Sequence, residues 1–240
     1  MKTRKNIISK IFNAKNLLWF IFFSFLVSIG YVIVRIVLAP TIMPTLDAVD
    51  RVKSDYVLML LQCVIGLFAM ILPRFIMRKN RWSIPTVMMS LYALFLYCAI
   101  YLGEVRNFYY NVPHWDTVLH TFSGAGLGAL GFSLVSLLNK SETLHLGLSP
   151  AFVAMFAFCF AVSLGVIWEI YEFTADGILQ TNMQKYSLEN NDMLIGRGAL
   201  ADTMKDLVVD VIGAFAMSII GFISLKYEKG WLERIQLKSQ

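Results

Sequence analysis

The sequence predicts an all-α polytopic membrane protein: one integral membrane domain over residues 1–240 with about six spans. Hydrophobic residues make up 58% of the chain and charged residues only 15%, so it is more apolar than soluble domains usually are. The hydrophobic residues also occur in long runs, and roughly 20 apolar residues cross the hydrocarbon core of a bilayer. The six runs are residues 17–38, 55–77, 83–103, 116–138, 151–174 and 200–225.

The runs differ in how directly they indicate a span. The first, 17–38, follows a basic segment (1–16) and is longer than the hydrophobic region of a signal peptide, about 7–15 residues, so we expect it to remain as a span. The second contains Pro73 and Arg74 near its end, whereas the third and fifth are clear. The fourth and sixth cross the membrane only if their acidic residues are tolerated there.

Basic residues predict that both termini are cytoplasmic. If the N-terminus, the turn at 78–82, the loop at 139–150 and the basic tail at 226–240 share one side, that side holds 14 of the 21 Lys and Arg residues but only three of the 16 Asp and Glu residues. Cytoplasmic loops carry the excess of Lys and Arg in membrane proteins, so we expect a multi-pass protein of the plasma or inner membrane. The net charge of +5 then reflects topology and gives no support for nucleic-acid binding. The 14 residues are Lys2, Arg4, Lys5, Lys10, Lys15, Arg74, Arg78, Lys79, Arg81, Lys140, Lys226, Lys229, Arg234 and Lys238.

Two outer loops and one group of glycines complete the expected organisation. The aromatic loop 104–115 should lie at the outer interface, where Tyr and Trp are enriched. The longest loop, 175–199, is either a functional lid or a plain solvated loop. Four glycines in the fourth span favour its close packing against the fifth or sixth, because small residues let membrane helices approach. They are Gly124, Gly126, Gly128 and Gly131.

Six acidic residues and one histidine lie at helical spacing in the last three spans. They are Asp116 and His120, then Glu169 and Glu172, then Asp202, Asp206 and Asp210. Ionisable groups within a span cost about 2.5–3.5 kcal/mol each on insertion scales, so these side chains should face one another and not the lipid. With the predicted topology all three groups fall in the outer half of the bilayer, which predicts one shared site.

The chemistry of this group favours a divalent metal ion. Clustered carboxylates raise one another's pKa values, and a bound cation removes that repulsion. Oxygen ligands with one imidazole suit Mg²⁺, Mn²⁺ or Ca²⁺, with Zn²⁺ as a further possibility. We expect metal ligands at Asp116, His120, Glu169, Asp202 and Asp206. His114, which follows Pro113, is expected to be a surface histidine, and His145 is excluded because it falls on the cytoplasmic side.

Two other interpretations remain open from the sequence. The acids could form a structural network, pairing with Arg35, Arg197 and Lys205 or sharing protons, with Asp202 as an N-cap of the sixth helix and Glu172 and Asp176 in interfacial water. They could instead line the pathway of a proton- or cation-coupled transporter, although the chain has no evident internal repeat.

Three motifs together resemble a known group of bacterial inner-membrane proteins. They are Asp116-Thr-Val-Leu-His120-Thr-Phe-Ser-Gly124, Trp168-Glu169-Ile-Tyr-Glu172-Phe, and Asp202-Thr203-Met-Lys-Asp206 followed by Asp210 and Gly213. Over residues 114–214 they resemble the YjdF-like proteins and, more distantly, the VanZ-like membrane proteins, which have Asn where this chain has Asp210. The resemblance implies a six-span bacterial membrane protein whose acidic motifs matter, and it implies no substrate.

The function predicted first is a metal-dependent enzyme of the outer leaflet, a hydrolase or transferase acting on a lipid or lipid-linked envelope substrate. Either Glu172 or Asp210 would act as the general base on a metal-bound water. The location at the membrane suggests the class of substrate, since no residue in the sequence identifies its headgroup. The alternatives are the transporter and a structural or partner-binding protein with a satisfied polar core.

Overall fold

The computed structural model describes residues 14–41, 51–80, 82–139, 147–188, 192–232 and 236–239. Six helical segments in these ranges are long and apolar enough to cross a membrane, which confirms the predicted all-α, multi-span fold. The long elements are α2 (Ala14–Leu38), α3 (Lys53–Asn80), α4 (Thr86–Leu96) continued by the π-helix η1 (Tyr97–Val105), α6 (Trp115–Asn139), α7 (Pro150–Leu179) and α8 (Arg197–Lys226). The short ones are β1 (Trp82–Ser83), α5 (Phe108–Asn111) and β2 (Lys238–Ser239).

The ends of the helices follow local sequence signals. Ser149 caps α7, and its hydroxyl accepts a hydrogen bond of 3.2 Å from the Phe152 amide. Pro150 takes the first helical position, where a backbone N–H would have no partner within the helix. Helix α8 begins after Gly196, whose positive φ of 61° is readily adopted by glycine because it has no Cβ. Asp202 therefore lies inside α8, and its predicted role as an N-cap is wrong.

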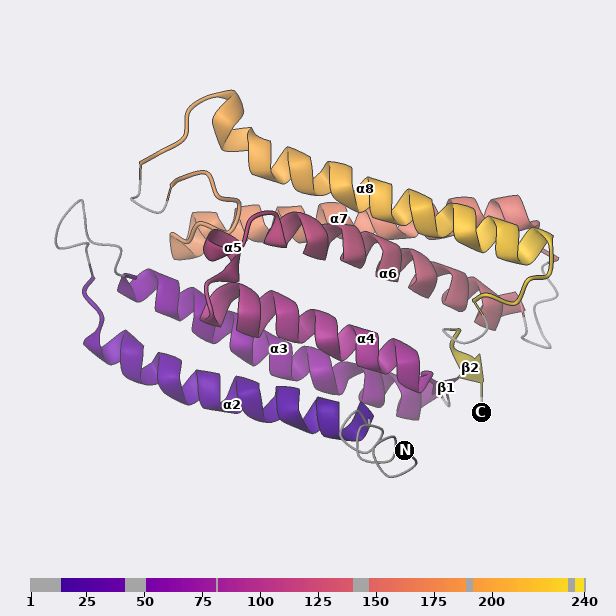
Figure 1. Cartoon of the computed structure of the whole chain (residues 1–240), viewed down its shortest axis with the longest axis horizontal. Coiled ribbons are helices and arrows are strands. Elements are labelled where there is room, and N and C mark those ends of the chain that lie inside the picture. Colours follow the sequence, from indigo (N-terminus) through magenta and orange to yellow (C-terminus); the bar gives the residue numbers. More distant parts are fainter. Residues whose placement is uncertain are drawn as a thin grey trace, which may run out of the picture.

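The long helices form two groups, one of α2, α3 and α4 and the other of α6, α7 and α8 (Figure 1). Each group buries apolar side chains of its own. In the first group, α2, α3 and α4 bury side chains against one another, including Phe25, Met70 and Leu96. In the second, α6 and α7 bury Phe132 and Ala157 together, and α8 packs along both helices (Figure 1). All the acidic motifs lie in the second group.

Glycines allow α6 and α8 to cross almost backbone to backbone. A Cβ atom at Gly124 would overlap the carbonyl oxygen of Asp210, and one at Gly213 would overlap the carbonyl oxygen of Thr121. A Cβ at Gly131 would lie 2.8 Å from Cα of Ala157 on α7. Close packing of the fourth span on the fifth and sixth is thus observed. Gly128 also faces α8, because a Cβ there would lie 3.2 Å from Met217 Cβ. Gly126 differs from the other three: a Cβ there would meet no atom within 4 Å, so it takes no part in this packing.

Both ends of the chain's helical part lie at the same end of the bundle. Figure 1 shows the start of α2 and the end of α8 near the small sheet in which β1 and β2 pair in antiparallel fashion. Basic residues gather in the helix ends here, at Lys15, Arg78 and Lys226. The cytoplasmic placement of this end stays a prediction. Seven of the 14 residues on which it rests lie outside the described ranges: Lys2, Arg4, Lys5, Lys10, Arg81, Lys140 and Arg234. His145, which the sequence assigned to the same side, also lies outside them.

The two connections expected on the outer side contain more helix, in their described residues, than the sequence suggests. Helix α7 continues to Leu179 and α8 starts at Arg197, so the expected loop 175–199 shrinks to residues 180–196. Asp176 and Glu172, which the structural interpretation placed in interfacial water, are both buried residues of α7, with exposures of 5% and 9%. The aromatic connection 104–115 is largely helical, and the ring of Tyr109 in α5 packs on Gly103 of η1.

Candidate metal centre

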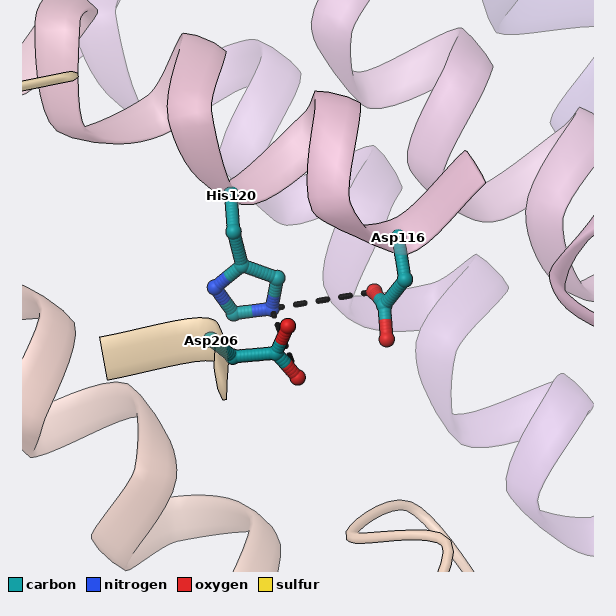
Figure 2. A group of neighbouring side chains, drawn as sticks. All are labelled: Asp116, His120 and Asp206. Atoms are coloured by element: carbon teal, nitrogen blue, oxygen red, sulfur yellow. Dashed lines mark ion pairs between the residues drawn. The ribbon is translucent and has the colours of Figure 1, made fainter. Parts of the chain in front are cut away.

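Asp116, His120 and Asp206 come together at the end of the bundle opposite the small sheet. Asp116 is in the first turn of α6, His120 follows one turn later, and Asp206 faces them from α8 (Figure 2). His120 Nε2 lies 3.7 Å from Asp116 Oδ1 and 4.0 Å from Asp206 Oδ2. One ligand atom from each residue lies within 4.8 Å of the other two, a separation that a single metal ion can bridge.

Asp210 holds the imidazole from the other side. Its Oδ2 lies 3.3 Å from His120 Nδ1, and its Oδ1 accepts a hydrogen bond of 2.9 Å from the Ser123 hydroxyl. Gly165 of α7 leaves room for this carboxylate, because a Cβ there would lie 2.7 Å from Asp210 Oδ2. With Nδ1 on Asp210, Nε2 points toward Asp116 and Asp206. A carboxylate behind a histidine in this way fixes the tautomer and the ring of a metal ligand.

Lys185 is the cation of the site, and the sequence analysis did not select it. Its ammonium pairs with Asp116 Oδ2 and lies 3.3 Å from Asp202 Oδ2, which links α6 to α8 through the loop. Burial disfavours the ammonium, but the two carboxylates outweigh that effect and raise the pKa of Lys185 above its ordinary value. Arg197 and Lys205, the expected partners on α8, are exposed.

Arg35, the third expected partner, donates instead to the hydroxyl of Tyr56 at 2.9 Å. Its side chain is thereby held on α3, in the first group of helices.

Asp176 shapes the loop that carries Lys185. Its carboxylate accepts hydrogen bonds from the Thr181 hydroxyl at 2.6 Å, the Met183 amide at 2.7 Å and the Gln184 amide at 2.9 Å. These three bonds turn the chain back over the bundle just after α7 ends, and Lys185 itself takes a left-handed φ of 48°. A residue expected in the solvent thus organises the approach of Lys185 to the site.

The two glutamates of α7 differ in their surroundings. Glu172 is buried, and its Oε1 accepts a hydrogen bond of 2.9 Å from the Trp168 indole. Glu169 is 4% exposed. The Thr203 hydroxyl lies close to its carboxylate, but among the described residues neither carboxylate oxygen makes a hydrogen bond of good geometry. Asp206 Oδ1 is also buried without a partner. The unsatisfied oxygens of the described part of this group are therefore in Glu169 and Asp206.

Tyr109 and Glu104 complete the surroundings of the site from the first half of the chain. The Lys185 ammonium lies 5.3 Å from the centre of the Tyr109 ring, and burial with nearby acids, Asp116 foremost, raises the pKa of Tyr109 well above its usual value. Glu104 Oε1 accepts a hydrogen bond of 3.3 Å from Gln62. Glu104 lies in the π-helix, a form often found at functional sites.

His114 is exposed, as the sequence predicts. The roles expected of the seven acidic and histidine residues stay predictions. Their placement is clear: Asp116, His120 and Asp206 converge, Asp210 supports His120, Asp202 pairs with Lys185, and Glu169 and Glu172 approach from α7.

Comparisons with known proteins give a family. An uncharacterized protein of Thermotoga maritima is 32% identical over 120 residues, which are 50% of this chain and 53% of the relative; the match thus spans about half the length of that relative. No solved structure matches the chain. The family model described as "Predicted membrane protein (DUF2238)" matches residues 29–227, which include the whole of five of the six candidate spans and the candidate site. The chain therefore belongs to the DUF2238 family of predicted membrane proteins.

Proposed function

We propose that this protein is a divalent-metal-dependent membrane enzyme whose metal ligands are Asp116, His120 and Asp206, with Glu169 completing the set. One observation carries the proposal: among the described residues Asp206 Oδ1 is buried without a hydrogen-bond partner, while Oδ2 of the same carboxylate lies 4.0 Å from the oriented imidazole of His120. Glu169 on α7 adds a second buried carboxylate without a well-formed hydrogen bond. Buried polar atoms are nearly always hydrogen-bonded, and a buried charge without a partner is costly. A divalent ion would satisfy these oxygens together.

The donor set fits a hard or intermediate cation. Three carboxylates and one imidazole suit Mg²⁺ or Mn²⁺, and Ca²⁺ or Zn²⁺ would also accept these donors. Asp210 keeps His120 Nδ1 occupied so that Nε2 is available as a ligand. This contact favours Asp210 as a positioning residue and leaves Glu172 as the general base, its carboxylate oriented by Trp168. When bound, the metal would supply a hydroxide at neutral pH or polarise the bond to be cleaved.

The substrate class follows from the setting. The ligands lie at one end of a bundle whose helices expose large apolar side chains, such as Phe173 at 68% and Met204 at 55%, beside the site. A lipid or lipid-linked envelope molecule could reach the ligands with its chain still in the membrane. We infer a hydrolase or transferase on such a substrate at the outer leaflet of the plasma or inner membrane. The finer resemblance to the YjdF-like and VanZ-like proteins belongs to this proposal, since the motifs that carry it hold these same ligands.

Metal binding by the purified full-length protein tests the proposal. After treatment with a chelator, titration with Mn²⁺ should show one site in the wild type. Asp206→Asn and His120→Gln should each weaken it by at least about tenfold, the loss typical of disturbed metal sites. Glu228→Gln is the matched control, because Glu228 is an exposed acid after the far end of α8. Wild-type protein that binds Mn²⁺ no better than Asp206→Asn would refute the metal centre.

The same variants separate the enzyme from a structural polar network. In a metal centre, Asp206→Asn relieves repulsion among carboxylates, so the metal-free protein should be as stable as the wild type or more stable. In a structural network, the substitution leaves partners unpaired and costs about 3–5 kcal/mol. Thermal unfolding with and without chelator decides between them. Release of products from phospholipids and lipid-linked phosphates, dependent on the metal and lost in Asp206→Asn, then tests catalysis.

A further inference from the structure

The Lys185 ammonium occupies a position built from three different elements. Asp116 on α6 and Asp202 on α8 contribute one carboxylate oxygen each, and the Tyr109 ring on α5 lies 5.3 Å away. The carboxylates are part-buried, with side-chain exposures of 15% and 18%. Carboxylate oxygens and the face of an aromatic ring both attract cations. The three groups therefore form a binding position for a positive charge. In this structure the charge is the ammonium of Lys185, a residue of the loop after α7.

Asp116 connects this position to the candidate metal centre. Its Oδ1 faces His120 Nε2 at 3.7 Å, while its Oδ2 holds Lys185. One carboxylate thus has an oxygen toward each of two adjacent cation positions. Enzymes with two metal ions, about 3.5–4 Å apart, place carboxylates between the ions in the same sense. In this chain the second position is filled by a side chain.

We propose that Asp116, Asp202 and Tyr109 form a second cation site beside the metal centre, and that the Lys185 ammonium fills it in place of a free cation. The neighbouring metal ion rests on the proposed function, whereas the second site rests only on the contacts of Lys185. The ligand class is a small cation, for which ethylammonium is the closest free equivalent of the lysine terminus. The Lys185 side chain also fixes the loop after α7 over the site, because its three partners belong to the bundle.

Removal of the tethered cation and its replacement by a free one tests the proposal. Purified full-length Lys185→Ala, kept in chelator, should unfold at a lower temperature than the wild type because Asp116 and Asp202 lose their shared counter-charge. Ethylammonium chloride should raise the unfolding temperature of this variant by about 2–4 °C more than choline chloride at equal ionic strength. Choline is the matched control because its quaternary headgroup offers no N–H donors. The wild type should show no difference between the two salts.

The double variant Lys185→Ala/Asp202→Asn identifies the site. This variant also lacks the Asp202 carboxylate charge, so it should lose the preference for ethylammonium over choline. Equal effects of the two salts on Lys185→Ala, or an equal preference in the double variant, would overturn the proposal. If Lys185→Ala is not recovered in folded form, Lys185→Gln keeps the side-chain stem and gives the same comparison. Lys185→Gln/Asp202→Asn should then be more stable than Lys185→Gln alone, and a double variant that is less stable would contradict the pairing.

These outcomes are independent of the metal at His120, since chelator is present throughout. A wild type that fails to bind Mn²⁺ would refute the proposed function. The ethylammonium comparison would still decide, on its own, whether the second cation site exists. If both proposals hold, Lys185→Ala should bind two Mn²⁺ ions per chain where the wild type binds one. A single Mn²⁺ ion in Lys185→Ala, together with an ethylammonium effect, would limit the second site to monovalent cations and contradict its likeness to a two-metal centre.

Discussion

Gly124→Ala tests whether the crossing of α6 and α8 positions the candidate metal centre. An alanine Cβ at this residue would overlap the Asp210 carbonyl oxygen and lie 3.0 Å from Asp210 Cα, whereas ordinary contact begins at 3.4 Å. The neighbouring atoms are backbone and cannot rotate away. We expect the two helices to move apart by about 1 Å at this level, as overpacked interiors do.

The displacement should affect stability and the site together. Overpacking costs about 1–3 kcal/mol, and the upper end applies because the atoms in contact are backbone. Alanine recovers about 1 kcal/mol through its better helix propensity, so the net loss should be about 2 kcal/mol. The contact between His120 Nδ1 and Asp210 Oδ2, now 3.3 Å, would exceed hydrogen-bonding distance. Affinity for Mn²⁺ should therefore fall with stability.

Gly126→Ala is the matched control, two residues along the same helix. A Cβ there meets no atom within 4 Å, so this variant should be as stable as the wild type or slightly more stable. The free energy of unfolding can be measured by adding SDS to protein in mild detergent micelles and following tryptophan fluorescence. If Gly124→Ala matched Gly126→Ala in both stability and Mn²⁺ affinity, the helix crossing would not determine the geometry of the site.

Three further predictions concern the loop and the topology. The raised pKa of Lys185 contributes stability that is fully present below its unfolded value of about 10.4 and is lost as pH rises through the folded pKa. Unfolding curves of the wild type should therefore keep this contribution up to about pH 10 and lose it progressively toward about pH 12, with a smaller fall in Lys185→Ala. Asp176→Asn weakens three hydrogen bonds to residues 181–184, and limited proteolysis should then cut this loop faster; equal rates would contradict its anchoring role. In a background without native cysteines, Ile195→Cys, at a side chain 90% exposed, should be labelled only from outside the cell and Lys229→Cys only from the cytoplasm, and the reverse pattern would invert the predicted topology.

The helices and their packing could be predicted because the bilayer restricts the options. Backbone groups in lipid must be satisfied within the segment, so long apolar runs become helices even where Pro73 interrupts the pattern: α3 continues through it to Asn80. The glycine spacing in α6 predicted close contact for the same kind of reason, because only small residues permit it. The face that each glycine presents depends on the partner helices, and Gly126 accordingly turned away from them.

The candidate site could be predicted only in the part that lies on helices. Asp116 and His120 share a face because they are four residues apart, and the charge pattern predicted that α6 and α8 turn their acids toward one end. Lys185 could not be found in this way, because it lies in a loop with no periodicity. Its position follows from three hydrogen bonds to Asp176, and the sequence assigned that residue to solvent. Asp176 was missed because α7 continues to Leu179, beyond the end of the apolar run at residue 174.

The distribution of partners among the acids favours a binding site over a structural network. A network that served only to join helices would satisfy each of its carboxylates, since an unpaired buried group costs stability. Here Asp202 has Lys185, Asp210 has Ser123 and His120, and Glu172 has Trp168. Asp116 is paired with Lys185 as well. Among the described residues, the buried carboxylate oxygens without a hydrogen-bond partner are therefore those of Glu169 on α7 and Asp206 on α8. Asp206 also lies 4.0 Å from His120 Nε2, so an unpaired buried carboxylate oxygen belongs to a residue that faces the position where a cation would bind.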